Sequence, residues 1–195
     1  MKRLIVMGLM AGLGTLASAA ELSRVAGDTI ALRGAIAEGD VDQLRQLATP
    51  GTTVLRINSD GGDPQAAMLL GRYLRQRQWS LAIDTVCAGS CALYVFPAAQ
   101  HTSIPDAAVL ALQESAFLRA QEGPQHMRRS LIEAGVPADE LERETAALAV
   151  QLAQVAALEA AFAAELGIAP AFYRDFRQVA AQADGVRQRF PDQEA

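Results

Sequence analysis

The chain has 195 residues, of which 51% are hydrophobic and 20% charged, and its formal net charge is -5. This length suits one domain with an additional helical piece, and the apolar content excludes a disordered chain. The acidic residues are spread out and no basic block interrupts them, so we expect neither nucleic acid nor an anionic membrane surface as a partner.

The first twenty residues have the layout of a secretory signal peptide. Lys2 and Arg3 give a positive start, residues 4–16 form an apolar run, and small residues follow. The run is shorter than the ~20 residues that span a bilayer, so we expect cleavage after Ala19 or Ala20. An uncleaved anchor is the alternative. We therefore expect a periplasmic or secreted mature protein without a membrane span.

Cleavage would change the chemistry that the mature chain can perform. Lys2 is the only lysine, so the mature chain would hold 15 arginines against 22 acidic residues, a net charge of -7. Cys87 and Cys91 would lie in an oxidising compartment. Four residues apart, they could form a short disulfide that pins the turn around Ser90, or stay two free buried thiols.

The first half of the mature chain alternates between strand and helix patterns. The expected elements are a strand at 29–36, a helix from 40 to about 48, a strand at 53–59, a helix from 64, a strand at 79–86, a buried helix at 90–98, an extended piece at 102–104 and a strand at 107–113. Asp40 and Asp63 are the predicted N-caps, and Pro64 suits a first helical turn. This alternation favours an α/β fold with a parallel sheet.

After residue 114 the sequence becomes helical. Residues 121–137 are rich in loop formers, with one helical segment at about 126–134. An Ala/Leu/Glu-rich helix is expected at 138–166, with Gly167 as its C-terminal stop, and another from 169 to about 183. The chain thus divides into a signal peptide (1–20), an α/β core (21–135) and a helical C-terminal region (136–195).

Two segments belong together chemically. "INSDGG" ends a buried strand in a turn with two glycines, and "CAGSCALYVF" opens a buried helix with Ser90 in its first turn. Glycines let backbone N–H groups approach a ligand, as an oxyanion hole requires. A helix start favours developing negative charge. Ser90 could instead be only the N-cap of its helix, and the glycines only a turn.

These segments resemble the ClpP/crotonase superfamily, and more closely its secreted ClpP-like branch. The resemblance is carried by "INSDGGDPQAAMLLGRYLRQR" (57–77) and "VCAGSCALYVFPAA" (86–99), and it extends over about residues 28–115. Secreted relatives have a pair of cysteines around the serine, as Cys87 and Cys91 are here. The resemblance implies a spiral of βαβ units with a helical C-terminal extension.

The resemblance also implies roles for particular residues. Ser90 falls on the family's nucleophile, and Gly61 and Gly62 fall on its oxyanion turn. Cys91 lies where a second oxyanion amide would come from. The family turn reads N-S-P-G-G, so Asp60 replaces a proline here.

The general base of this family is missing. ClpP-like enzymes have a histidine at the end of the next strand, and the matching position here is Gln113. Glutamine only donates and accepts hydrogen bonds. A Ser–Lys dyad is excluded in a mature chain without lysine. His126 is the candidate substitute base, whereas we expect His101 at the far end of the serine helix and Glu114 to point away. Losing a base costs on the order of 10⁴ to 10⁶ in rate.

We therefore expect a degenerate serine-peptidase-like protein that binds an extended peptide by strand addition or assembles with itself. An active serine hydrolase that uses His126 or a base from another subunit is one alternative. The other is a non-catalytic interaction protein whose Ala/Leu stripe at 141–166 is the contact surface, although the same stripe suits packing within the chain. We expect no cofactor and no metal ion.

Overall fold

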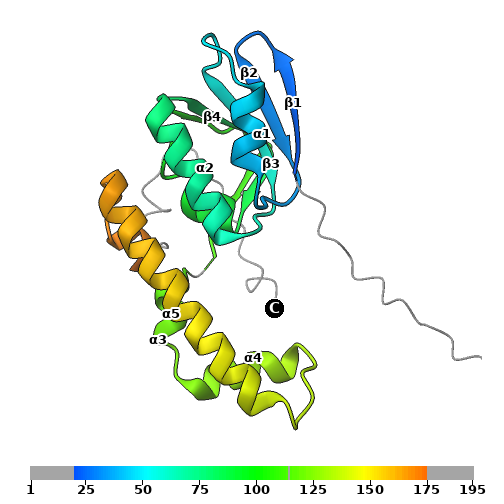
Figure 1. The fold of residues 1–195 in the computed structure, drawn as a ribbon, viewed down its shortest axis with the longest axis vertical. Helices are drawn as coiled ribbons and strands as arrows, with labels where there is room; N and C mark the ends of the chain where they lie inside the picture. The colour runs from blue at the N-terminus through cyan, green and yellow to red at the C-terminus, as the bar shows by residue number, and fades with distance from the viewer. Residues whose placement is uncertain (1–19, 114, 175–195) are drawn as a thin grey trace, which may run out of the picture.

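The structure, a computed structural model, describes residues 20–113 and 115–174 (Figure 1). The predicted signal peptide therefore lies outside the described residues, apart from Ala20. In chain order the elements are β1 (Glu21–Ala26), β2 (Thr29–Arg33), α1 (Asp40–Leu47), β3 (Val54–Ser59), α2 (Pro64–Arg77), β4 (Ser80–Ala88), the π-helical turn η1 (Cys91–Val95), β5 (Thr102–Ser103), β6 (Val109–Ala111), α3 (Ala116–Gln121), α4 (Pro124–Glu133), α5 (Leu141–Leu166) and α6 (Ala171–Arg174).

The described strands form one six-stranded sheet in the order β1-β2-β3-β4-β5, with β6 also paired to β4. β1 runs antiparallel to β2, and the other pairs are parallel. Helices α1 and α2 connect successive parallel strands, as βαβ units require. The predicted α/β class is confirmed, and the sheet is mixed because β1, which the sequence analysis did not predict, adds an antiparallel edge.

One face of the sheet carries the core. Alternate residues of β2, β3 and β4 point to the face that α1, α2 and η1 cover, and their side chains are fully buried. These residues are Ile30, Leu32, Leu55, Ile57, Leu81 and Ile83. Their alternation is the period-2 pattern of a sheet with one apolar face. On the other face Asp84 pairs with Arg33 at 3.5 Å and with Arg56 at 3.4 Å.

Of the two predicted N-caps, one is confirmed. Asp63 caps α2, since its Oδ1 accepts the N–H of Ala66 at 2.7 Å. The prediction for α1 is wrong by one residue: Gly39 is the N-cap, with φ +93°, and Asp40 is the first helical residue. The buried Asp40 carboxylate accepts the N–H of Ala37 at 2.8 Å, so it closes the preceding turn instead.

Several predicted boundaries also shift. Strand 29–36 ends at Arg33, strand 79–86 extends to Ala88, helix 90–98 is reduced to η1, and strand 107–113 is reduced to β6. The loop-rich segment contains α4 and follows an unpredicted helix, α3, because Ser115 caps α3 and a proline starts α4. Helix 138–166 begins three residues later, at Leu141, and ends at Leu166 with Gly167 as its C-cap, as predicted. α6 covers only the start of helix 169–183, most of which lies outside the described residues.

The long helix α5 runs from beside α2 to α4 (Figure 1). Its inward stripe consists of Leu141, Leu152, Glu159, Phe162 and Ala163. Arg72 of α2 lies above the Phe162 ring and donates to Glu165 at 2.6 Å. By length and composition α5 is the one helix among the described residues that could cross a membrane. In this fold it packs against α2, α3 and α4.

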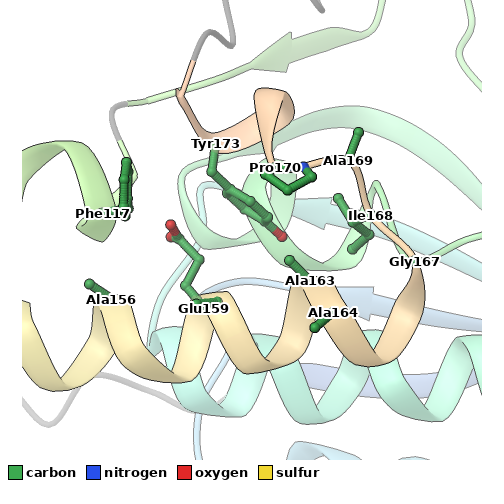
Figure 2. Close-up of a pocket in the computed structure, with 11 residues that line it drawn as sticks. Phe117, Ala156, Glu159, Ala163, Ala164, Gly167, Ile168, Ala169, Pro170 and Tyr173 are labelled. Carbon is green, nitrogen blue, oxygen red and sulfur yellow. The ribbon is translucent and has the colours of Figure 1, made fainter.

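Buried hydrogen bonds join the C-terminal helices to η1. The Tyr94 hydroxyl of η1 donates to Glu159 Oε2 of α5 at 2.9 Å, and the Tyr173 hydroxyl of α6 donates to the Leu93 carbonyl at 3.1 Å. Ser115 donates to the Tyr173 carbonyl at 3.0 Å. Burial raises the pKa of the Glu159 carboxyl, although the bond from Tyr94 lowers it in part. Figure 2 shows Glu159 reaching from α5 toward Tyr173.

We predict that Tyr94→Phe destabilises the fold. The substitution leaves the buried Glu159 carboxyl without its donor, so the free energy of unfolding should fall by about 1–3 kcal/mol. Urea unfolding measures this change. Tyr73→Phe is the matched control, because Tyr73 is also a buried tyrosine and its hydroxyl makes no hydrogen bond among the described residues. Equal losses in the two variants would contradict a special role for Tyr94.

Candidate functional site

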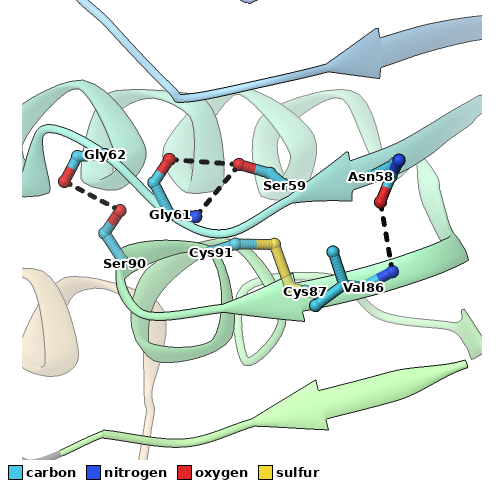
Figure 3. The surroundings of a disulfide bond; sticks show 8 residues. All are labelled: Asn58, Ser59, Gly61, Gly62, Val86, Cys87, Ser90 and Cys91. Carbon is cyan, nitrogen blue, oxygen red and sulfur yellow. Dashed lines mark hydrogen bonds between the residues drawn. A yellow bond between two sulfur atoms is a disulfide. The ribbon is translucent and has the colours of Figure 1, made fainter.

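The turn after β3 is held by Ser59. Its Oγ accepts the N–H of Gly61 and donates to the Gly61 carbonyl, both at 3.1 Å (Figure 3). Gly61 has φ +111°, and a Cβ there would lie 2.9 Å from the Ser90 nitrogen and 3.0 Å from the Ala88 carbonyl oxygen. Glycine at position 61 therefore lets the turn approach the serine loop, which is the segment 88–90 that carries Ser90. The Gly61 N–H is used within the turn and does not face a ligand.

Gly62 directs its polar groups toward the serine. Ile36 donates to the Gly61 carbonyl at 2.7 Å, and Asp63 donates to the Ile36 carbonyl at 2.8 Å. These two bonds make a parallel bridge between Ile36 and Gly62. In such a bridge the N–H and C=O of Gly62 itself point away from Ile36. The Gly62 carbonyl accepts the Ser90 hydroxyl there at 3.1 Å. Of the two glycines predicted for the oxyanion turn, Gly62 is thus the one whose N–H lies on the serine side.

An irregular pairing of β3 with β4 sets the position of the serine loop. The register shifts between Ile57 and Ser59, and the Asn58 side chain accepts the Val86 N–H at 3.2 Å in place of a ladder bond. Beyond this point Cys87 and Cys91 form a disulfide, with Cα atoms 5.4 Å apart (Figure 3). The bond spans the turn that carries Ser90, which was one of the two states left open by the sequence.

Ser90 stands at the N-cap position of η1, but its side chain makes no capping hydrogen bond. It precedes η1 without a side-chain bond to the helix backbone, and its hydroxyl instead donates to Gly62. Ser90 is 7% exposed. Cys91 follows it as the first residue of η1, where the second oxyanion amide is expected. The N-cap interpretation is thus confirmed for the position of Ser90, whereas the side-chain capping bond that it implies is absent.

The serine lies in a cavity of about 280 Å³ between the glycine turn, η1, α3 and α5. Its apolar wall contains Leu93, Leu148, Leu152 and Val155. Its polar side chains, besides Ser90, are Gln113, Arg119 and Gln151 and the hydroxyl-bearing Tyr94. No histidine, lysine, aspartate or glutamate is among the described residues that line it. Such a cavity offers hydrogen bonds and one positive charge, but no group that removes a proton at neutral pH.

Gln113 does reach the serine turn. It lies two residues beyond β6 and lines the same cavity as Ser90 and Gly62. Its Oε1 is 3.5 Å from the point where a Cβ on Gly89 would stand, and Gly89 directly precedes the serine. The structure therefore brings together three of the residues that the sequence analysis selected: Ser90, Gly62 and Gln113.

The two histidines lie elsewhere. His126 is on α4, its side chain is 54% exposed, and its Nε2 is 3.4 Å from Glu122 Oε2. His101 is exposed between η1 and β5. Neither lines the serine cavity. Glu114, expected to point away from the site, lies outside the described residues. A base from within this chain is thus not supplied by either histidine in this structure.

Sequence reasoning missed the residues that α3 and α5 contribute. Arg119 lies on a helix that was not predicted, and Gln151 lies within an alanine-rich stretch whose spacing indicates only a helix. The cap residue Ser115, followed by a helix-forming run, was the one local signal that could have placed Arg119 on a helix. Glu159 was likewise missed, because a glutamate in such a helix normally faces solvent.

The chain matches no family model, no curated protein and no solved structure. The fold and the geometry together establish an α/β protein with a cavity that contains Ser90 and lies beside the Gly61-Gly62 turn. Within the described ranges no cluster of three or more His, Cys, Asp or Glu is arranged to hold a metal.

We predict that Gly61→Ala disrupts the approach of the glycine turn to the serine. The new Cβ would contact the backbone of Ser90 and Ala88, and the positive φ adds strain, so unfolding should become easier by about 1–3 kcal/mol. Gly27→Ala is the control, since a Cβ there meets nothing within 4 Å. Urea unfolding of both variants provides the comparison. A Gly61→Ala protein as stable as the Gly27→Ala protein would show that the turn is not tightly packed.

Proposed function

We propose that this chain is a secreted ClpP-like protein of the crotonase superfamily, built as a βαβ spiral with a helical C-terminal extension, whose serine site binds an extended peptide without efficient hydrolysis. The observation that carries the proposal is the Ser90 hydroxyl, which donates to the Gly62 carbonyl in a cavity whose described lining offers no proton acceptor of useful basicity. A serine in this state is a weak nucleophile.

The backbone of Gly62, which faces away from Ile36, supports peptide binding. Its N–H and C=O face the serine cavity rather than Ile36, so an extended segment could pair with them by strand addition. The apolar wall from η1 and α5 would accept a side chain of that segment. A cavity of about 280 Å³ is at the small end of ligand sites, which fits one or two side chains of a peptide.

The charge of the cavity favours a particular kind of peptide. Arg119 is the one charged residue in the described lining, and the side chains of Gln113 and Gln151 line the same cavity. A guanidinium with amide donors suits a carboxylate. We therefore propose a peptide that presents a carboxylate, such as its own C-terminus, to Arg119.

Labelling with a fluorophosphonate tests the loss of catalysis. We predict that the mature wild-type protein stays unlabelled by intact mass under conditions that fully label a known serine hydrolase. Gln113→His puts an imidazole in the cavity wall and should speed labelling of Ser90 by about 10²-fold, whereas Gln113→Asn should not. Adding Ser90→Ala should abolish the labelling. Labelling of the wild type that Ser90→Ala removes would contradict the proposal and favour an active hydrolase.

Fluorescence anisotropy tests whether a peptide binds and whether its C-terminal carboxylate contributes to binding. The probe is fluorescein-labelled Ala-Leu-Ala-Leu-Ala, with either a free or an amidated C-terminus. We predict that the free carboxylate binds up to roughly fivefold more tightly, as expected for a partly exposed ion pair. Arg119→Gln should remove this difference, and Arg128→Gln, exposed on α4, should preserve it. Absence of binding by both peptides would contradict peptide recognition at this site.

A further inference from the structure

A second cavity, of about 530 Å³, lies between α3, α5 and the segment that leads into α6 (Figure 2). Alanines of α5 form its floor, Phe117 and Ile168 stand at opposite ends, and Tyr173 lies between them beside Pro170. Its volume is in the range of small-molecule sites, and most of its surface is apolar. None of the residues that line it also lines the serine cavity.

The polar feature of this second cavity is an incompletely paired carboxyl group. Glu159 is 1% exposed, and its Oε2 accepts the Tyr94 hydroxyl at 2.9 Å. Its Oε1 is buried and has no hydrogen-bond partner among the described residues. In Figure 2 the carboxyl points into the space between Phe117 and Tyr173. A buried oxygen without a donor is costly, and such groups normally have a partner.

The protein groups around Glu159 do not complete its pairing. The N–H groups of Phe117 and Ala116, in the first turn of α3, and the Ser115 hydroxyl lie near the Glu159 carboxyl and lower its pKa in part. None of the three completes a hydrogen bond to Oε1, and the Ser115 hydroxyl donates to the Tyr173 carbonyl instead. Burial is the larger effect, so the pKa of Glu159 is raised overall. The wall of the cavity therefore contains an acceptor, Glu159 Oε1, that no donor of the described residues pairs in hydrogen-bond geometry.

We propose that this cavity binds a small primary ammonium with an apolar body, whose N–H donates to Glu159 Oε1. A cation matches the charge of the carboxylate and supplies the missing donor. The rings of Phe117 and Tyr173 flank the carboxyl, and aromatic faces attract an ammonium. The apolar body of the ligand would cover the alanine floor. An anion of the same shape would be repelled by the carboxylate.

The proposed ammonium site is independent of the proposed peptide function. The serine cavity carries Arg119 and suits a carboxylate, whereas the second cavity carries Glu159 and suits a cation. Tyr94 separates them, since it lines the serine cavity and donates its hydroxyl to Glu159. An amine could therefore bind whether or not peptides do.

Isothermal titration of the mature full-length protein with n-hexylamine at pH 7.5 tests this site. Hexan-1-ol has the same apolar body without the charge, and hexanoate carries the opposite charge. We expect saturable binding of the amine, at least about tenfold tighter than of the alcohol, and no binding of hexanoate. Glu159→Gln should abolish the preference for the amine. Glu142→Gln, exposed on the same helix, should retain it.

The proposal is overturned if hexylamine does not bind, if the alcohol binds equally well, or if Glu159→Gln keeps the preference. Thermal unfolding shows whether each variant is folded. Ala160→Phe tests the site without touching the carboxyl, because Ala160 lines the cavity and is exposed enough to accept a ring. This variant should weaken hexylamine binding about tenfold or more, and unchanged binding in a folded Ala160→Phe protein would also overturn the proposal.

Discussion

The buried hydrogen bond between the Tyr94 hydroxyl and the Glu159 carboxyl joins the α/β core to the C-terminal helices. It spans 65 residues of sequence and lies just behind the serine, since Tyr94 belongs to the π-helical turn that Ser90 precedes. The bond from Tyr173 to Leu93 reinforces the same junction. One wall of the serine cavity comes from η1 and another from α5. The cavity therefore exists only while this junction holds the two walls together.

The chemistry of the site follows from how its turn is made. Close packing of Gly61 against the serine loop and the disulfide at Cys87 and Cys91 hold the serine in place. The same packing directs the Gly62 carbonyl to the Ser90 hydroxyl. That acceptor satisfies the hydroxyl but cannot take its proton, and Gln113 beside it cannot either. The geometry is thus compatible with holding a ligand near the serine, and it is poorly arranged for activating the serine.

Local patterns predicted the parts of the fold that depend on neighbouring residues. The Asp63 cap, the Gly167 stop and the alternation of strands with helices all arise within a few residues, and the structure confirms them. The proximity of Ser90, Gly62 and Gln113 was expected from the resemblance to the ClpP/crotonase superfamily, and the parallel strands of this sheet account for it, since they bring the ends of β3, β4 and β6 to one edge. Arg119 and Glu159 were not foreseen. Their roles depend on packing between α3, α5 and η1, and no local spacing signals that a glutamate in an alanine-rich helix is buried.

The central claim is that the serine is held in an assembled cavity to which residues 20–113 and 115–174 contribute no base. A crystal structure of the mature protein at high resolution tests this claim most directly, by the partners of the Ser90 hydroxyl. We predict that Oγ donates to the Gly62 carbonyl, with Gln113 in the adjacent wall and His126 on α4 outside the cavity. A histidine nitrogen or carboxylate oxygen within hydrogen-bond reach of Ser90 Oγ, from the same chain or a neighbouring subunit, would contradict it.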